Sequence, residues 1–142
     1  MGRFIIDTNI LIYIITEDFD SLSNDVKTIL DDYESEILIS METVRELIVA
    51  FRRKKLLSKT FRSSLEMIDS LQRDYGVRIV QTDMEVMRTL AKMTINEAEE
   101  HNDPSDHIII AQAITMRLPL ISSDRKFTFY RNQGLDLIFN DK

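Results

Sequence analysis

The segment from Asn102 to Ala113 constrains the fold most strongly, because it places a carboxylate at the start of a helix that is apolar on nearly every side. Asp103 followed by Pro104 is typical of a helix N-terminus, where aspartate caps the helix and proline occupies its first position. Residues three and four apart share a helix face, so Asp106 lies in line with the isoleucines at 109 and 110. We therefore predict a buried helix in which Asp106 either interacts with the helix dipole or faces a partner for its charge.

Short apolar runs alternate with helix-like segments along the chain, an order typical of a parallel sheet covered by helices. The runs predicted to form strands are residues 3–6, 36–40, 77–81, 118–121 and 135–139. The segments predicted to form helices are residues 8–15, 23–33, about 43–55 after caps at Ser40 or Thr43, 58–74, 82 to about 94, and 104 onward. A break is expected near Thr94, because a helix continuous to Glu100 would bring the next helix to the wrong edge of the sheet. The prediction is an α/β fold with residues 1–142 as a single domain.

The composition excludes several kinds of site. With no cysteine, the chain has no disulfide, thiolate zinc site or cysteine nucleophile, and it fits a reducing compartment. Two histidines, His101 and His107, argue against a histidine-built zinc site, so any metal is expected to be bound by oxygen. The N-terminal apolar run is interrupted by Asp7 and is too short to span a membrane. We expect a cytoplasmic protein with no membrane partner.

The charge is unevenly distributed. A net charge of −6 argues against a nucleic-acid partner, which usually requires a basic patch. Between Arg45 and Arg62, however, the chain has seven basic residues and only one acid, Glu46. The densest part of this region is the run of Arg52, Arg53, Lys54 and Lys55. We predict that this run contacts a phosphate backbone, the alternative being a solvated helix end.

Four acids are predicted to meet at one edge of the sheet. Asp7 and Asp124 directly follow the first and fourth strands, and Glu46 and Asp106 lie near the starts of helices. In a parallel sheet the carboxyl ends of the strands, and the helix N-termini that follow them, share the edge where active sites form. The sequence therefore predicts a cluster of four carboxylates at this edge.

Each of these acids could instead have a purely structural role. Asp7 alone would cap a helix, and Glu46 with Thr43 matches a capping box, in which the glutamate only satisfies a backbone N–H. Glu42, one turn earlier, competes with Glu46 for a place in the cluster. Four caps at one edge, with no compensating lysine or histidine among them, would nevertheless be unusual, so the cluster is the preferred interpretation.

A carboxylate cluster of this kind requires cations. Two carboxylates about 4 Å apart repel by about 4 kcal/mol at an effective dielectric constant near 20. Hard oxygen ligands select Mg²⁺ or Mn²⁺, which can activate water and stabilise the charge on a phosphodiester during its cleavage. We predict phosphodiester hydrolysis, with Asn9, Asp103 and Ser122 as auxiliary members of the site.

The order of these motifs resembles a PIN-domain nuclease of the VapC toxin type. The resemblance rests on Phe4-Ile5-Ile6-Asp7-Thr8-Asn9, Glu46 in a helix, His101-Asn102-Asp103-Pro104-Ser105-Asp106, and Leu120-Ile121-Ser122-Ser123-Asp124-Arg125-Lys126-Phe127. It implies a three-layer α/β/α fold with a five-stranded parallel sheet in the order 3-2-1-4-5. It also implies that Asp7, Glu46, Asp106 and Asp124 are the metal-binding acids.

The resemblance further implies a Mg²⁺-dependent endoribonuclease, usually a homodimer, that a cognate antitoxin neutralises by inserting beside the active site. RNA would then be the nucleic acid held by the basic run. Asn102 and Ser105 stand where close relatives often carry arginine and phenylalanine, and residues 94–100 form a longer, more acidic connection than usual. These departures concern the substrate or partner more than the chemistry.

Two other functions would use a similar edge of the sheet. A phospho-acceptor domain would need a second aspartate two residues after Asp7, where Asn9 stands, and a lysine directly after a late strand, whereas Lys126 lies beyond Asp124. A catalytically idle PIN-like interaction module would be favoured if the acids failed to bind metal. The presence of all four acids argues against both.

Overall fold

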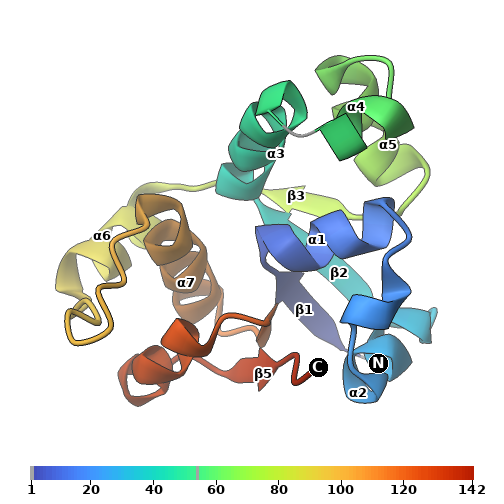
Figure 1. The fold of residues 1–142 in the computed structure, drawn as a ribbon. Helices are drawn as coiled ribbons and strands as arrows, with labels where there is room; N and C mark the ends of the chain where they lie inside the picture. Colours follow the sequence, from blue (N-terminus) through green and yellow to red (C-terminus); the bar gives the residue numbers. More distant parts are fainter. Residues whose placement is uncertain (1, 54) are drawn as a thin grey trace.

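The five strands form one parallel sheet in the order β3-β2-β1-β4-β5, with helices on both faces (Figure 1). The computed structural model describes residues 2–53 and 55–142, without the side chains of residues 55 and 56. The strands are β1 (Arg3–Ile6), β2 (Glu36–Ser40), β3 (Arg78–Val80), β4 (Leu120–Ser122) and β5 (Leu137–Phe139). The predicted fold class and strand order are confirmed.

Helices connect successive strands, as parallel pairing requires. The α-helices are α1 (Thr8–Ile15), α2 (Asn24–Asp31), α3 (Met41–Arg53), α4 (Lys55–Thr60), α5 (Ser64–Arg73), α6 (Met84–Lys92) and α7 (Pro104–Met116). Two 3₁₀ segments, η1 (Phe19–Ser21) and η2 (Arg125–Gln133), complete the described elements. None of the helices among the described residues is both long and apolar enough to cross a membrane.

Two hydrophobic cores lie on opposite faces of the sheet. Neighbouring residues of a strand point to opposite faces, so Ile6 packs into one core and Ile5 into the other. The first core receives buried side chains from α1 to α5, and the second receives them from α7 and η2. Buried residues in the central strands of a sheet covered on both faces explain why the strands are continuous apolar runs rather than alternating ones.

The predicted helix 58–74 is wrong, because the chain forms two helices here. The helix α4 ends at Thr60, and Ser63 caps α5 by accepting a hydrogen bond from the Glu66 amide at 3.0 Å. A serine side chain that satisfies a free amide favours a new helix start. The helix predicted to reach about Lys55 is described to Arg53, and Lys54 lies outside the described residues.

The predicted break near Thr94 is confirmed. The helix α6 ends at Lys92, and α7 begins at Pro104 after Asp103, whose side chain accepts a hydrogen bond from the Ser105 amide at 2.9 Å. Between them, the buried side chain of Asn96 donates to the backbone oxygen of Lys126 at 3.3 Å and ties this connection to η2. The N-terminus of α7 therefore reaches the carboxyl edge of the sheet.

Candidate functional site

The four predicted acids line one cavity of about 260 Å³ at the carboxyl edge of the sheet. The cavity is lined by Asp7, Thr8, Asn9, Ile12, Glu46, Ala50, Asp103, Asp106 and Asp124. These residues come from the end of β1, from α1 and α3, and from the segments that begin α7 and η2. The topology thus brings together residues separated by more than a hundred positions in the chain.

Asp7 lies at the junction of β1 and α1 and is 5% exposed. Its Oδ1 caps α1 by accepting the Ile10 amide at 3.0 Å, and its Oδ2 accepts the Ser122 hydroxyl at 2.5 Å. Burial raises the pKa of Asp7 to about 7 in spite of both hydrogen bonds, and the charges of Asp106 and Asp124 raise it further. The predicted cap and the predicted member of the cluster are therefore the same carboxylate.

Asp106 occupies the first turn of α7 and is half-buried. Burial is the main cause that raises its pKa to about 7, and the carboxylates of Asp103, Glu46 and Asp124 contribute in the same direction. Near neutral pH, this acid is consequently close to balance between its protonated and ionised forms.

Glu46 enters the cavity from the second turn of α3, one turn later than predicted. Its Oε1 accepts the Thr8 hydroxyl at 2.5 Å, and burial raises its pKa. The capping box with Thr43 is wrong, because α3 begins at Met41 and the Ser40 hydroxyl accepts the Glu42 amide at 3.1 Å. Thr43 is thus the third residue of α3 and not its cap, and the Glu46 side chain binds Thr8 instead of the Thr43 amide.

Glu42, the competing acid, is absent from the residues that line this cavity. Arg45 forms an ion pair with it, and the Ser105 hydroxyl donates to its Oε1 at 2.8 Å. Glu46, rather than Glu42, is therefore the member of the α3 pair that meets the other acids.

Asp124 precedes η2, and its Oδ1 accepts the Lys126 amide at 2.9 Å. The buried hydroxyl of Ser122 connects it to Asp7, because this oxygen donates to Asp7 and accepts the Asp124 amide at 3.1 Å. Ser122 does not line the cavity, but it fixes two acids that do. The auxiliary residues Asn9 and Asp103 are exposed at the cavity lining.

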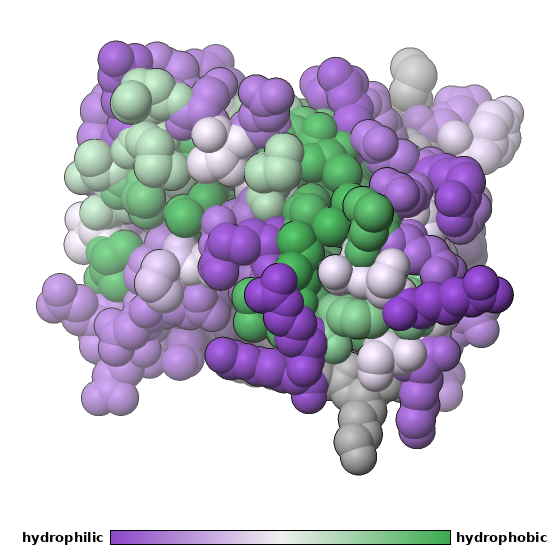
Figure 2. All heavy atoms as spheres, turned by 90° about the horizontal axis from the view of Figure 1, so that it is seen from above, coloured by the Kyte–Doolittle hydropathy of each residue, from purple (hydrophilic) through white to green (hydrophobic). Residues whose placement is uncertain are grey.

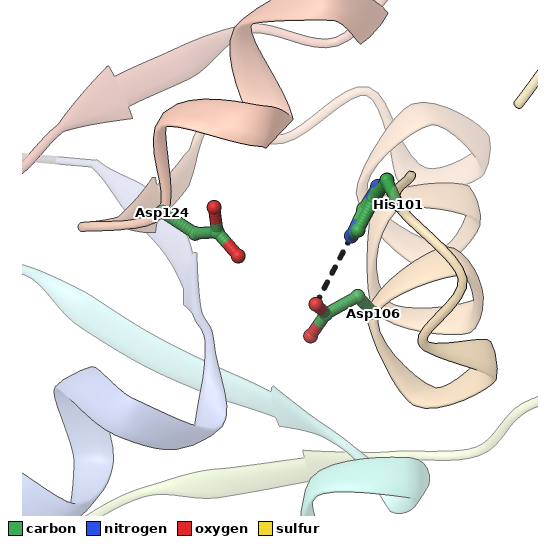
Figure 3. A group of neighbouring side chains, drawn as sticks. All are labelled: His101, Asp106 and Asp124. Atoms are coloured by element: carbon green, nitrogen blue, oxygen red, sulfur yellow. Dashed lines mark hydrogen bonds and ion pairs between the residues drawn. The ribbon is translucent and has the colours of Figure 1, made fainter. Parts of the chain in front are cut away.

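His101 is a member of the site that the sequence patterns did not predict. It is 2% exposed, and its Nε2 lies 3.0 Å from Asp106 Oδ2 (Figure 3). Figure 3 also shows the Asp124 carboxylate facing this pair from the other side, and one ligand atom from each of the three residues lies within 4.8 Å of the others. The expectation that no histidine lies among the acids was therefore wrong, because the loop before α7 folds His101 back over the helix start.

The basic run begins on the helix that supplies Glu46. Arg52 and Arg53 are exposed at the end of α3. Arg53 is three residues beyond Ala50, which lines the cavity, and that spacing corresponds to about 4.5 Å along a helix axis. Lys54 lies outside the described residues, and the side chain of Lys55 is not described.

The donor set fits a hard divalent cation. Five carboxylates line the cavity, and burial raises the pKa of three of them, Asp7, Glu46 and Asp106, with neighbouring carboxylates contributing in the same direction. Asp7, Glu46, Asp106 and Asp124 could hold Mg²⁺ or Mn²⁺ through oxygen, the ligand that both ions prefer. Such an arrangement can bring a phosphodiester and a water molecule to the same cation.

From the raised pKa values of Asp7 and Asp106 we predict how the stability of the metal-free protein depends on pH. Asp7 and Asp106 have a reference pKa of 3.8 and a folded-state pKa of about 7, so folding takes up protons between these values. Their contribution to stability is complete below about pH 4 and is lost as the pH rises through about 7. The free energy of unfolding in EDTA should therefore fall over this range, and Asp106→Asn should reduce the fall.

Urea denaturation at a series of pH values measures this dependence. Burial lowers the pKa of His101 below 6.5, an opposing effect whose stabilisation is lost as pH falls through the folded-state pKa. Asp83→Asn is the matched control, because asparagine also caps helices and Asp83 is an exposed cap of α6 that does not line the cavity. A free energy of unfolding that rises with pH, or an equal slope for Asp106→Asn and the wild type, would contradict the prediction.

Comparison with known proteins agrees with this fold. The sequence profile described as the PIN domain matches residues 4–133. No curated protein matches this sequence.

Several solved structures have the same fold. One is a chain of VapBC2 from Rickettsia felis, in a structure with a DNA fragment from the VapBC2 promoter. It is 20% identical, the match covers 98% of this chain and 99% of that chain, and the TM-score is 0.71. A chain of VapBC-1 from nontypeable Haemophilus influenzae is 20% identical, with 99% of each chain covered and a TM-score of 0.70. A chain of DNA-bound VapBC from Salmonella typhimurium is 18% identical, with 98% of each chain covered and a TM-score of 0.69. The profile match spans most of the sequence, and the chain belongs to the PIN domain family.

Proposed function

We propose that this protein is a Mg²⁺- or Mn²⁺-dependent endoribonuclease and the VapC-type toxin of a toxin–antitoxin pair. The observation that carries the proposal is the meeting of Asp7, Glu46, Asp106 and Asp124 around one cavity of a PIN domain. The electrostatics of the cavity support the proposal, because a bound cation would stabilise the ionised forms of Asp7 and Asp106, whose pKa values burial raises. Neither serine, cysteine nor histidine is needed as a nucleophile in such a site.

In the proposed reaction, the acids hold the cation and the surrounding residues fix the acids. Ser122 donates to Asp7, and Thr8 donates to Glu46, so each carboxylate keeps a defined direction toward the cavity. A bound divalent cation would activate water and stabilise charge on the cleaved phosphodiester. Ile12 and Ala50, both half-buried, form the apolar part of the lining on the α1–α3 side.

The proposed protein partner is an antitoxin. Figure 2 shows an apolar strip between hydrophilic borders on the face where α3, α4 and α5 lie. The half-buried apolar side chains of α3 include Ile48, Ala50 and Phe51, which pack against the core. Ala50 also lines the acidic cavity, so a segment docked near α3 would lie beside the acids. The similar chains from VapBC structures support an antitoxin as the partner. We also propose that two copies of this chain form a homodimer.

The first test is RNA cleavage. Cleavage should stop in excess EDTA and return with Mg²⁺ or Mn²⁺, and Glu46→Gln should reduce its rate about 10³-fold, equivalent to losing several kcal/mol of transition-state stabilisation. Glu42→Gln is the matched control one turn away, because Glu42 pairs with Arg45 outside the cavity. Undiminished cleavage in EDTA by protein free of contaminating nuclease would contradict metal dependence, and failure of the acids to bind either metal would favour an idle PIN-like module.

The second test concerns the basic run. Replacing Arg52, Arg53, Lys54 and Lys55 together by serine should weaken RNA binding and lower its salt slope, since each phosphate contact on a single strand contributes about 0.7 to that slope. Arg73→Ser is the control. Arg73 is the last residue of α5, which precedes β3, so it lies toward the amino ends of the strands and away from the acidic cavity. The affinity for Mn²⁺ should not change. An unchanged salt slope would indicate that these four residues do not bind RNA and instead form a solvated helix end or contact another protein.

The third test concerns the antitoxin. A short DNA-binding protein encoded in the adjacent reading frame should form a complex with this chain and inhibit its RNA cleavage in a concentration-dependent way. Ala50→Glu should weaken the complex at least tenfold by placing a charge at an apolar position of α3 beside the acidic cavity, whereas Met84→Glu, at an exposed apolar position of α6, should have a smaller effect. Complex formation that leaves cleavage unchanged would contradict insertion beside the site.

A further inference from the structure

The buried ring of His101 makes a polar contact through each of its nitrogens. Its Nε2 lies 3.0 Å from Asp106 Oδ2, and its Nδ1 lies 2.9 Å from the hydroxyl of Tyr130. The ring also lies 5.6 Å from Phe127, centroid to centroid. These contacts leave the imidazole little freedom to change its orientation.

Hydrogen-bond donors and acceptors determine which nitrogen carries the proton. The Asn96 amide donates to the Tyr130 oxygen at 3.1 Å, and the phenol proton is then available for His101 Nδ1. If Nδ1 instead donated to Tyr130, the buried phenol proton would have no acceptor among the contacts of the described residues. The network therefore favours a proton on Nε2, which donates to Asp106.

The backbone of His101 is fixed on both sides. Its amide donates to the Asn96 oxygen at 3.0 Å, and its carbonyl oxygen accepts a hydrogen bond from His107 Nε2 at 2.7 Å. His107 belongs to α7, as Asp106 does. The loop residue and the carboxylate that it contacts are thus attached to the same helix start, so their relative position is well defined.

We propose that His101 is a positioning residue for Asp106, holding one carboxylate oxygen by its Nε2–H so that the other is presented to a divalent cation. This inference rests on the proposed function, in which Asp106 is a metal ligand. Asp106 Oδ2 accepts the hydrogen bond from His101 Nε2, while Oδ1 has no hydrogen bond within the described part of the chain. Tyr130 and Asn96 extend the arrangement by fixing the tautomer of the histidine.

The expected size of the effect follows from the behaviour of other metal sites. Groups that orient a metal ligand without touching the metal typically change its affinity by about 10- to 100-fold. Direct ligation by His101 is the competing outcome, because its nitrogen and the oxygens of Asp106 and Asp124 lie within 4.8 Å of one another. In that case Nε2 would be unprotonated and bonded to the metal.

The experiment measures binding of Mn²⁺ alone by isothermal titration calorimetry, without RNA. His101→Leu should weaken Mn²⁺ binding about 10- to 100-fold. His101→Gln should recover much of this loss, because its amide can donate near the position of Nε2. Tyr130→Phe should have a smaller effect, because it removes the group that selects the tautomer. An affinity of His101→Leu equal to that of the wild type would overturn the proposal.

Three controls distinguish positioning by His101 from unfolding, from direct ligation and from the absence of a metal site. Urea denaturation in EDTA identifies loss of affinity caused by unfolding, and His101→Gln and Tyr130→Phe still decide the matter if His101→Leu does not fold. Pulsed electron paramagnetic resonance of the Mn²⁺-loaded wild type should show no directly bound nitrogen, and a directly coupled nitrogen would overturn the proposal. Failure of the wild type to bind Mn²⁺, or equal binding by Asp106→Asn, would instead refute the proposed function.

Discussion

Burial of carboxylates at the carboxyl edge of the sheet, together with the repulsion among them, is the unfavourable contribution that the rest of the fold must oppose. Burial raises the pKa values of Asp7 and Asp106 to about 7, which means that ionising these groups in place is unfavourable. The two hydrophobic cores on opposite faces of the sheet provide the opposing stabilisation. The helix α7 takes part in both effects, because it buries Ile109 and Ile110 in one core and carries Asp106 in its first turn.

Capping and membership of the acidic cavity are compatible roles for one residue. Asp7, Asp103 and Asp124 each accept a backbone amide at the start of a helix, and each also lines the cavity. The geometry explains why, since helix N-termini and strand carboxyl ends occupy the same edge in a parallel α/β sheet. The amides also attract negative charge, so the fold offsets part of the repulsion with the same groups that position the acids.

The sequence predicted those parts of the structure that depend on local patterns. Strands appeared as short apolar runs, and acids directly after strands were correctly expected to meet, although the strand order came from the family resemblance. The break at Ser63 was missed because the apolar spacing continues across it, while the capping hydrogen bond depends on one serine rotamer. His101 was missed because its approach to Asp106 depends on the irregular loop before α7, which has no periodicity to interpret.

The different environments of Glu42 and Glu46 illustrate the same limit within a single helix. The two residues are four positions apart, so they share a face of α3, and helical spacing alone does not distinguish them. Arg45 and Ser105 bind Glu42, whereas Glu46 receives the Thr8 hydroxyl and has a pKa raised by burial. Ser105 belongs to α7, so the choice between two acids of α3 depends on a contact between helices that are distant in the sequence. Ser105 thereby helps to keep Glu42 paired outside the cavity.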